Sequence, residues 1–283
     1  MHSIVITLSC VDRPGIVRAV ADFFFERHCD IAESHQFGDP GSGTFFMRVH
    51  LRASPETPRT EALREEFSAI ASEFGMDYQI HDLARRPRVL LMVSRDDHCL
   101  NDLLYRWRSG QLPIEIPAIV SNHRDLEHLA AWHEIPFHHV PVTKETKPEA
   151  ERRLLDLVAE HEVDLVVLAR YMQILSEDLC KELDGRAINI HHSFLPSFKG
   201  AAPYRQAHER GVKLVGATAH YVTSDLDEGP IIEQDVRRVD HTSTVEDLVS
   251  LGREVEARTL ARAVQWHVQR RVLLNGHRTV VFT

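Results

Sequence analysis

The stretch Pro87-Arg88-Val89-Leu90-Leu91-Met92-Val93 decides the fold of most of this chain. Its five consecutive apolar residues predict a short strand buried on both faces, which is typical of a parallel sheet. Further apolar runs of this kind follow at residues 116–120, 137–140 and 165–169. Helical patterns lie between the runs, near residues 98–108, 125–133 and 149–161. This alternation predicts an α/β fold with a doubly wound, mostly parallel sheet.

The residues before this stretch carry a different pattern. Alternating apolar residues predict a strand over 3–10, and Asp12-Arg13-Pro14-Gly15 opens an apolar helix. A strand pair, a second helix and a last strand follow, near residues 31–37, 44–51, 63–74 and 76–81. The order βαββαβ is that of a ferredoxin-like unit. The charged segment Arg85-Arg86-Pro87-Arg88 separates the two patterns, so we expect domains over residues 1–84 and 85–283.

Polar residues follow a later apolar strand of the second domain. In Ala187-Ile188-Asn189-Ile190-His191 the side chains alternate between faces, so Asn189 and His191 share one face and His192 takes the other. Pro196 cannot continue a central ladder, so the strand must end near it. Open α/β sheets bind ligands at the carboxyl ends of their strands, which makes Asn189 and His191 candidate site residues.

A second polar group lies further along the chain. A strand over 216–222 carries His220 and is followed by the loop Asp225-Leu226-Asp227-Glu228-Gly229-Pro230. Taken singly, Asn189 and Asp227 are typical turn residues and His191 is typical of a hydrogen-bonded core histidine. Taken together, they favour a reaction site. A late helix is expected to begin with a capping box formed by Ser243 and Glu246.

The order Asn-x-His-x-Ser-x-Leu-Pro, then His-x-Val, then Asp-x-Gly-Pro-x-Ile resembles the catalytic core of the folate-dependent formyltransferase and formyl hydrolase family. The resemblance implies 10-formyltetrahydrofolate as substrate, with no permanently bound cofactor. Asn189 and His191 would then stabilise the oxyanion of a tetrahedral intermediate. Asp227, with a pKa raised by burial, would act as base or proton relay, and His220 would orient its carboxylate.

A segment after the 165–169 strand resembles the part of that family that lines the pteridine pocket. Family members often carry Arg where Gln173 stands, and the segment can also be read as a loop that caps a helix. The resemblance implies folate contacts from Arg170, Tyr171, Met172, Gln173, Ile174, Leu175, Leu226 and Glu228.

The first loop of the second domain bears on the formyl acceptor. Sugar-phosphate binders place glycines there so that backbone amides can cradle the phosphate. Residues 94–101 contain no glycine, and Asp96 and Asp97 would repel a phosphate. We therefore expect water as acceptor. The family resemblance then implies that the products are formate and tetrahydrofolate, and that the reaction supplies formate for purine synthesis and balances the one-carbon folate pool. Transfer of the formyl group to an amine acceptor is the alternative.

The first turn of the N-terminal domain, Asp12-Arg13-Pro14-Gly15-Ile16-Val17, resembles the small-ligand-binding ACT module. The resemblance implies an amino-acid effector, glycine or methionine, bound near Asp12, Pro14 and Gly15 in a homo-oligomer, dimer or tetramer. A helix cap with a first-turn proline and a turn glycine is the alternative interpretation.

Composition and residue patterns exclude several other classes of protein. A net charge of −9 with mixed signs argues against nucleic acid as a partner. The four scattered cysteines, the lack of a secretory signal and the absence of a long apolar segment predict a cytoplasmic protein without membrane contact. A metal hydrolase is disfavoured because His191 and His192 face opposite ways, so no metal is expected. A non-catalytic folate or amino-acid sensor remains a further alternative.

Overall fold

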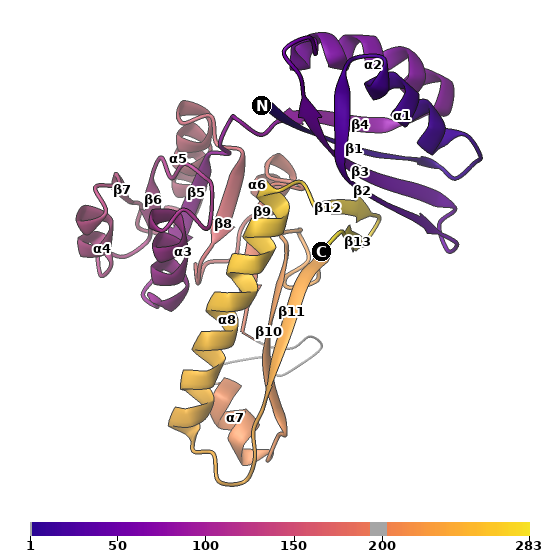
Figure 1. The fold of residues 1–283 in the computed structure, drawn as a ribbon. Coiled ribbons are helices and arrows are strands. Elements are labelled where there is room, and N and C mark those ends of the chain that lie inside the picture. Colours follow the sequence, from indigo (N-terminus) through magenta and orange to yellow (C-terminus); the bar gives the residue numbers. More distant parts are fainter. Residues whose placement is uncertain (1, 193–202) are drawn as a thin grey trace. The chain divides into compact units, whose positions relative to one another are not determined.

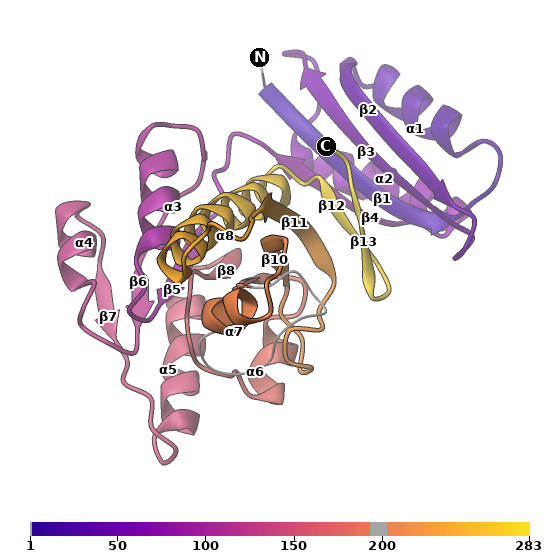
Figure 2. The same ribbon diagram turned by 90° about the horizontal axis from the view of Figure 1, so that it is seen from below.

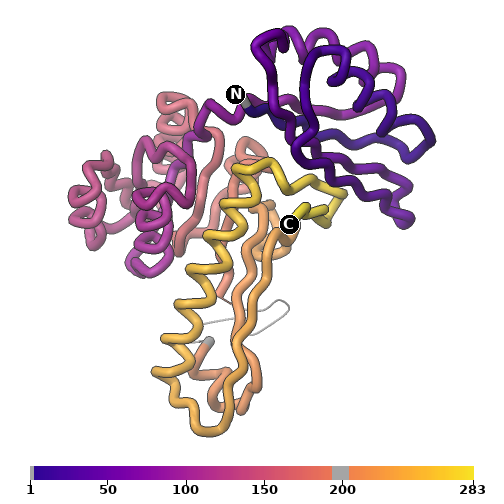
Figure 3. The backbone as a smooth tube through the Cα atoms, viewed as in Figure 1, coloured from indigo at the N-terminus to yellow at the C-terminus, as the bar shows by residue number. Residues whose placement is uncertain are grey.

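The chain is analysed as a computed structural model that describes residues 2–192 and 203–283. It divides into two compact units (Figure 1). The second unit comprises Pro87–Val268 and Gly276–Arg278, and the first comprises Met1–Arg86, Gln269–Asn275 and Thr279–Thr283. The division differs from the predicted domains at the carboxyl end, because most residues after Val268 belong to the first unit. Figure 3 traces this return of the chain.

The first unit has the predicted order of elements, which are β1 (His2–Val11), α1 (Ile16–Phe25), β2 (Cys29–Asp39), β3 (Thr44–Ala53), α2 (Thr60–Phe74) and β4 (Asp77–Asp82). Its strands are antiparallel in the order β2-β3-β1-β4. Both helices cover one face of this sheet (Figure 1). Alternate residues of β1, Ile4 and Ile6, face a core that contains Phe24 and Phe67 from the helices.

The end of the chain completes the first unit with β12 (Val272–Asn275) and β13 (Arg278–Val281). The guanidinium of Arg48, only 3% exposed, donates to the carbonyl oxygen of Gln269 at 3.1 and 3.2 Å. It also pairs with Glu33 at 3.1 Å. The first unit therefore depends on residues that are distant in sequence for partners of a buried charge.

The second unit contains the mostly parallel sheet that the sequence predicts. Its strands are β5 (Val89–Val93), β6 (Ile119–Ser121), β7 (Phe137–His139), β8 (Leu165–Leu168), β9 (Ala187–His191), β10 (Leu214–Tyr221) and β11 (Ile231–Arg238). The spatial order is β11-β10-β9-β8-β5-β6-β7. Strands β5 to β9 run parallel to one another, whereas β10 is antiparallel to both of its neighbours, β9 and β11. From β5 the chain moves to one side through β6 and β7, and it then returns to β8 on the other side.

Helices cover both faces of this sheet. They are α3 (His98–Arg108), α4 (Glu127–Trp132), α5 (Lys147–Glu160), α6 (Glu177–Glu182), α7 (Pro203–Glu209) and α8 (Val245–Val268). Residues of α5 and α6 pack with Leu90, Met92 and Leu168 in one apolar cluster. Figure 2 shows α3 and α8 on the opposite side of the strands from α5 and α6. None of the described helices is both long and apolar enough to cross a membrane.

Two local predictions need correction. The capping box of α8 is formed one residue later than predicted, by Thr244 and Asp247 rather than by Ser243 and Glu246. The Asp247 amide donates to Thr244 Oγ1 at 3.1 Å, and the Thr244 amide donates to Asp247 Oδ2 at 2.8 Å. In the first unit Gly15, with φ of 101°, is the N-cap of α1, so Pro14 precedes the helix instead of lying in its first turn.

Candidate active site

Strand β9 presents Asn189 and His191 on one face, as its alternation requires. In the antiparallel pairing with β10, His220 lies directly opposite Asn189. In the parallel pairing with β8, Leu168 lies beside Asn189, so the segment after β8 starts next to this residue. Three neighbouring strands therefore bring their polar ends together. The expected strand end at Pro196 lies outside the described residues; β9 itself ends at His191.

The loop after β10 carries Asp227 in the left-handed region, with φ of 59°. Aspartate tolerates this conformation better than most residues, although it stores strain of roughly 1–3 kcal/mol. The loop is held against the strand because the Tyr221 amide donates to the Pro230 carbonyl oxygen at 2.9 Å. Gly229 allows this approach, since a Cβ at that position would collide with the Tyr221 carbonyl oxygen. The loop conformation fixes where the carboxylate stands.

The four predicted reaction residues are linked to one another through Asn189 and Asp227. The amide nitrogen of Asn189 donates to His220 Nε2 at 3.3 Å and to Asp227 Oδ1 at 3.4 Å. His191 Nδ1 lies 3.1 Å from Asp227 Oδ2. Asn189 and His191 are thus joined through one carboxylate, which leaves His191 Nε2 as the ring nitrogen for other partners.

The pKa of Asp227 differs from the predicted one. Burial would raise the pKa of this carboxyl, but hydrogen bonds and opposite charge from His191 and His220 lower the pKa well below its ordinary value. The predicted rise in pKa is therefore wrong. Asp227 is an ionised carboxylate at neutral pH.

His220 also has a more definite role than predicted. Its Nδ1 lies 2.8 Å from the Tyr221 carbonyl oxygen, which can only accept, so Nδ1 carries the proton. Nε2 faces the two other groups: it can accept from the Asn189 amide at 3.3 Å in the neutral ring, or donate toward Asp227 at 3.7 Å in the protonated ring. His220 accordingly orients Asn189 more directly than it orients the carboxylate.

The predicted folate segment follows β8 and has an apolar, accessible side. The exposed fractions of Met172, Ile174 and Leu226 are 56, 61 and 61%, which is unusual for such side chains. Gln173, Ile174 and Leu175 border a pocket of about 10 Å³, which has room for little more than one water molecule. Glu228 is exposed on the loop beside Asp227. Tyr171 instead turns into the core, where burial raises the pKa of its hydroxyl to about 12.

Arg170 does not offer its side chain to that pocket. With φ of 67°, it directs its guanidinium to Asp96 at 3.0 Å and to His192 Nδ1 at 2.9 Å. It also lies 3.4 Å from Glu256, a carboxylate that is 1% exposed. Burial and the neighbouring Arg170 charge lower the pKa of His192 to about 4, so this ring accepts the hydrogen bond as a neutral imidazole.

The contacts of Arg170 were not predicted from the sequence. A usable signal was present, because Glu256 stands at a position of α8 where the helix periodicity requires an apolar residue. A buried acid of this kind must find partners.

The effector residues predicted in the first unit lie together in the turn before α1. Asp12, Pro14 and Gly15 are exposed, and the Asp12 amide donates to the Gly43 carbonyl oxygen at 2.9 Å. The turn is thus fixed by the hairpin between β2 and β3 and remains accessible.

Comparison with known proteins shows which family and which relatives this chain is similar to. The formyl transferase family model matches residues 87–264. Formyltetrahydrofolate deformylase of Corynebacterium sp. strain P-1 is 53% identical over 98% of this chain and 97% of its own. The crystal structure of formyltetrahydrofolate deformylase from Burkholderia mallei has a TM-score of 0.96 and 54% identity, with both chains fully covered. Glycinamide ribonucleotide transformylase 1 from Symbiobacterium toebii is more distant, with a TM-score of 0.65 and 30% identity over 72% of this chain and 97% of that one.

Proposed function

This chain belongs to the formyl transferase family, and on that premise we propose that it hydrolyses 10-formyltetrahydrofolate to formate and tetrahydrofolate. The observation that carries the proposal is full-length similarity to formyltetrahydrofolate deformylases, the first unit included. The transformylase comparison covers only 72% of the chain. Water is therefore favoured over an amine as the acceptor of the formyl group.

The reaction forms a bond from a water oxygen to the formyl carbon and breaks the bond from that carbon to the folate nitrogen. A negative oxygen develops in between and needs donors that are already in place. We assign this role to the Asn189 amide and to His191, which can donate from Nε2 only in its protonated form because its Nδ1–H is held by Asp227. The Asn189 amide now donates to His220 and Asp227, and these hydrogen bonds fix its orientation. One of its N–H groups must give up its present acceptor to donate to the oxyanion.

Asp227 connects the two proton transfers of the reaction. Water loses one proton and the folate nitrogen gains one, so a relay between them balances the reaction. An ionised Asp227 accepts a hydrogen bond from the attacking water and holds Nδ1 of His191. Its lowered pKa makes it a weak base, which favours orientation and relay over lasting deprotonation.

The folate ring is assigned to the apolar surface beside this group. Met172, Ile174 and Leu226 supply accessible apolar area for a flat heteroaromatic ring, and Gln173 lies between the first two in the sequence. Backbone groups of residues 171–175 would bind the polar edge of the ring. The Arg170 guanidinium is already committed to Asp96, His192 and Glu256 and is left out of this contact.

The first unit is proposed to be an ACT-like effector domain. Its strand order and the exposed turn of Asp12, Pro14 and Gly15 support binding of an amino acid such as glycine or methionine in a homo-oligomer. Isothermal titration with each amino acid tests this assignment, and no heat of binding from either would oppose it.

The hydrolysis itself is tested with purified protein and 10-formyltetrahydrofolate in buffer that contains no amine. Formate and tetrahydrofolate should appear in equal amounts. Formate release that requires an added amine would favour the transferase alternative.

A further inference from the structure

The fold of the second unit has one crevice where a ligand is expected by topology. In open α/β sheets that crevice lies outside the carboxyl ends of two adjacent strands whose connections leave in opposite directions. Here these strands are β5 and β8, because the chain runs from β5 to β6 on one side and β8 lies on the other. The segment after β5 contains Asp96 and His98, and the segment after β8 begins with Ala169 and Arg170.

Side chains from four parts of the chain meet at this crevice. Arg170 contacts Asp96 at 3.0 Å and Glu256 at 3.4 Å. Glu256 accepts hydrogen bonds from Tyr204 at 2.6 Å and from His98 Nε2 at 2.9 Å. We call these five residues the crevice network. Its members come from the β5 and β8 ends, from α7 and from α8.

Arg170 and Glu256, the two central groups of the crevice network, are buried and oppositely charged, whereas the Asp96 side chain is 36% exposed. Burial would raise the pKa of Glu256, but hydrogen bonds from His98 and Tyr204 and the Arg170 charge lower it. Burial would lower the pKa of Arg170, but the Glu256 and Asp96 charges raise it. Both groups therefore stay charged in a dry setting, where removal of either partner leaves a costly unpaired charge.

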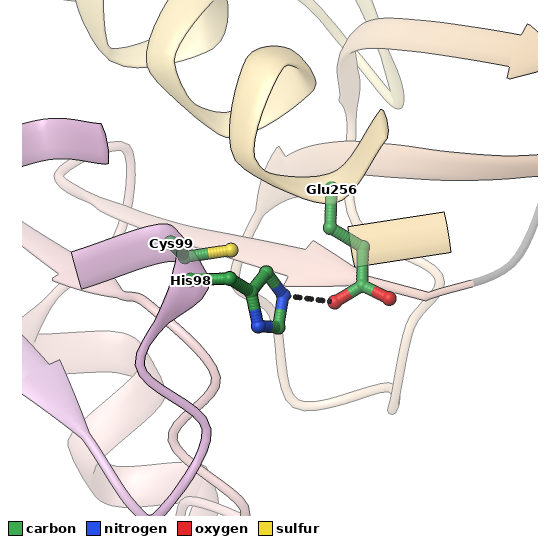
Figure 4. A group of neighbouring side chains, drawn as sticks. All are labelled: His98, Cys99 and Glu256. Carbon is green, nitrogen blue, oxygen red and sulfur yellow. Dashed lines mark hydrogen bonds and ion pairs between the residues drawn. The ribbon is translucent and has the colours of Figure 1, made fainter. Parts of the chain in front are cut away.

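A metal site is a poor explanation of this cluster. Figure 4 shows His98 and Cys99 at the start of α3 facing Glu256 on α8, and their ligand atoms lie within 4.8 Å of one another. The Arg170 guanidinium, however, already neutralises Glu256 and would repel a cation. Burial also raises the pKa of the Cys99 thiol well above its ordinary value, which opposes the thiolate that a metal needs.

The network closes the crevice against a larger ligand. His98 lines an open groove between α3 and α8 and also contacts Glu256, so its imidazole stands at the inner end of that groove. On the other side Tyr204 lies against Gly252 of α8, where a Cβ would collide with the tyrosine ring. His192 joins the network to the reaction site, since its ring is held by Arg170 and lies 5.0 Å from the ring of His191. The prediction that these two histidines face opposite ways is therefore wrong, because β9 ends at His191 and its alternation does not extend to His192.

We propose that the crevice network occupies the acceptor side of the reaction site and that this exclusion of an amine acceptor leaves water as the only nucleophile. The proposal rests on the hydrolase function argued above and extends it to acceptor specificity. More distant relatives named phosphoribosylglycinamide formyltransferase must accommodate a bulky amine acceptor, as their name implies. In this chain a buried arginine, a tyrosine and a histidine fill the corresponding crevice.

The test opens the crevice and counts products. Arg170→Gly removes the central side chain and suits the left-handed backbone at that position. Enzyme, 10-formyltetrahydrofolate and glycinamide are incubated together, and formate and formylglycinamide are quantified by mass spectrometry. In the transfer the new bond from carbon to the amine nitrogen replaces the bond to the folate nitrogen, which takes up the proton that the amine loses. Because the readout is a product ratio, a slower variant remains informative.

We expect the wild type to give formate alone. In Arg170→Gly the ratio of formylglycinamide to formate should rise to at least roughly ten times the detection limit. Small steric differences in a pocket typically change specificity by about that factor. His98→Ala opens the crevice from the groove side and should act in the same direction if Arg170→Gly does not fold. Arg186→Gly is the matched control, because that arginine contacts the Glu182 carbonyl oxygen at the other end of β9.

Three results would overturn the proposal. The wild type could form formylglycinamide as efficiently as the variants, or Arg186→Gly could raise the product ratio as much as Arg170→Gly does. The crevice variants could also fold and remain active while releasing only formate. A wild type that releases no formate would instead contradict the hydrolase function.

Discussion

At the level of single residues, Asp227 shows why position can be predicted more readily than charge state. Alternation along β9 and the turn residues after β10 place Asn189, His191 and Asp227 together, and the structure confirms that they meet. The pKa of Asp227 depends on two imidazoles that approach it through tertiary structure, and burial alone predicts the wrong sign.

Asn189→Ala should lower kcat with little change in KM. The amide is assigned to the oxyanion, which exists only in the transition state, and loss of one such donor typically costs about 3–4 kcal/mol. Steady-state kinetics of formate release measure both constants. A variant with a raised KM and an unchanged kcat would move Asn189 from catalysis to substrate binding.

His192 should make stability depend on pH. Its pKa falls from 6.5 in the unfolded chain to about 4 in the folded protein. As pH falls through 6.5 the unfolded chain takes up a proton that the folded protein refuses, so stability is lost between about pH 6.5 and pH 4. From pH 7 to pH 5 this single group should cost about 2 kcal/mol.

The change His192→Gln isolates that contribution. Glutamine can accept the Arg170 hydrogen bond but does not titrate. Urea unfolding of the second unit at both pH values should show a smaller loss for the variant than for the wild type. His133→Gln is a comparison at a less buried histidine whose pKa is lowered by burial and by Arg108. Equal losses in wild type and His192→Gln would contradict the assignment.

At the level of elements, continuous apolar runs predicted the parallel strands and the order βαββαβ predicted the first sheet. The short helices α6 and α7 and the hairpin of β12 and β13 were missed, since one or two turns leave too few residues for a period to show. The α8 cap was missed by one residue because Ser243 and Thr244 are both good caps, and the choice depends on which hydroxyl meets the Asp247 amide.

Gly229→Ala should displace the loop that carries Asp227. The added Cβ would collide with the Tyr221 carbonyl oxygen, so the loop and strand must separate. We expect a large loss of kcat in a protein that still folds. Gly110→Ala is the control: its φ of 76° also strains alanine, by roughly 1–2 kcal/mol, but open space surrounds it far from Asp227 in sequence.

Formate release and urea unfolding of both glycine variants separate the two effects. Gly110→Ala should lose stability and keep its turnover. If Gly229→Ala turns over as fast as Gly110→Ala, the loop does not set the carboxylate position.

At the level of the whole molecule, the sequence predicted two domains but not the return of the chain. Nothing in residues 269–283 alone marks them as part of the first unit, because the signal is a buried Arg48 whose guanidinium pairs with Glu33 in its own segment but also needs the Gln269 carbonyl oxygen. The crevice network was missed for a related reason, since its members come from segments up to 160 residues apart, from Asp96 to Glu256.

Ending the chain after Val268 should destabilise the first unit by at least about 2 kcal/mol, because Arg48 loses a carbonyl acceptor and Glu33 loses the contact with Arg271. Hydrogen exchange of the β3 amides measures the stability of the first unit separately from that of the second. In an Arg48→Met background the same truncation should cost less, since methionine has no hydrogen bond to the Gln269 carbonyl oxygen to lose. An equal cost in both backgrounds would show that Arg48 is not the reason.

The central claim is that water attacks a formyl group held by Asn189, His191 and Asp227. Turnover of 10-formyltetrahydrofolate in ¹⁸O-labelled water, without any amine, tests it most directly. The account predicts formate that carries one solvent oxygen, formed in equal amount with tetrahydrofolate and strongly slowed in Asn189→Ala. Unlabelled formate, or labelled formate produced equally fast by Asn189→Ala, would contradict it.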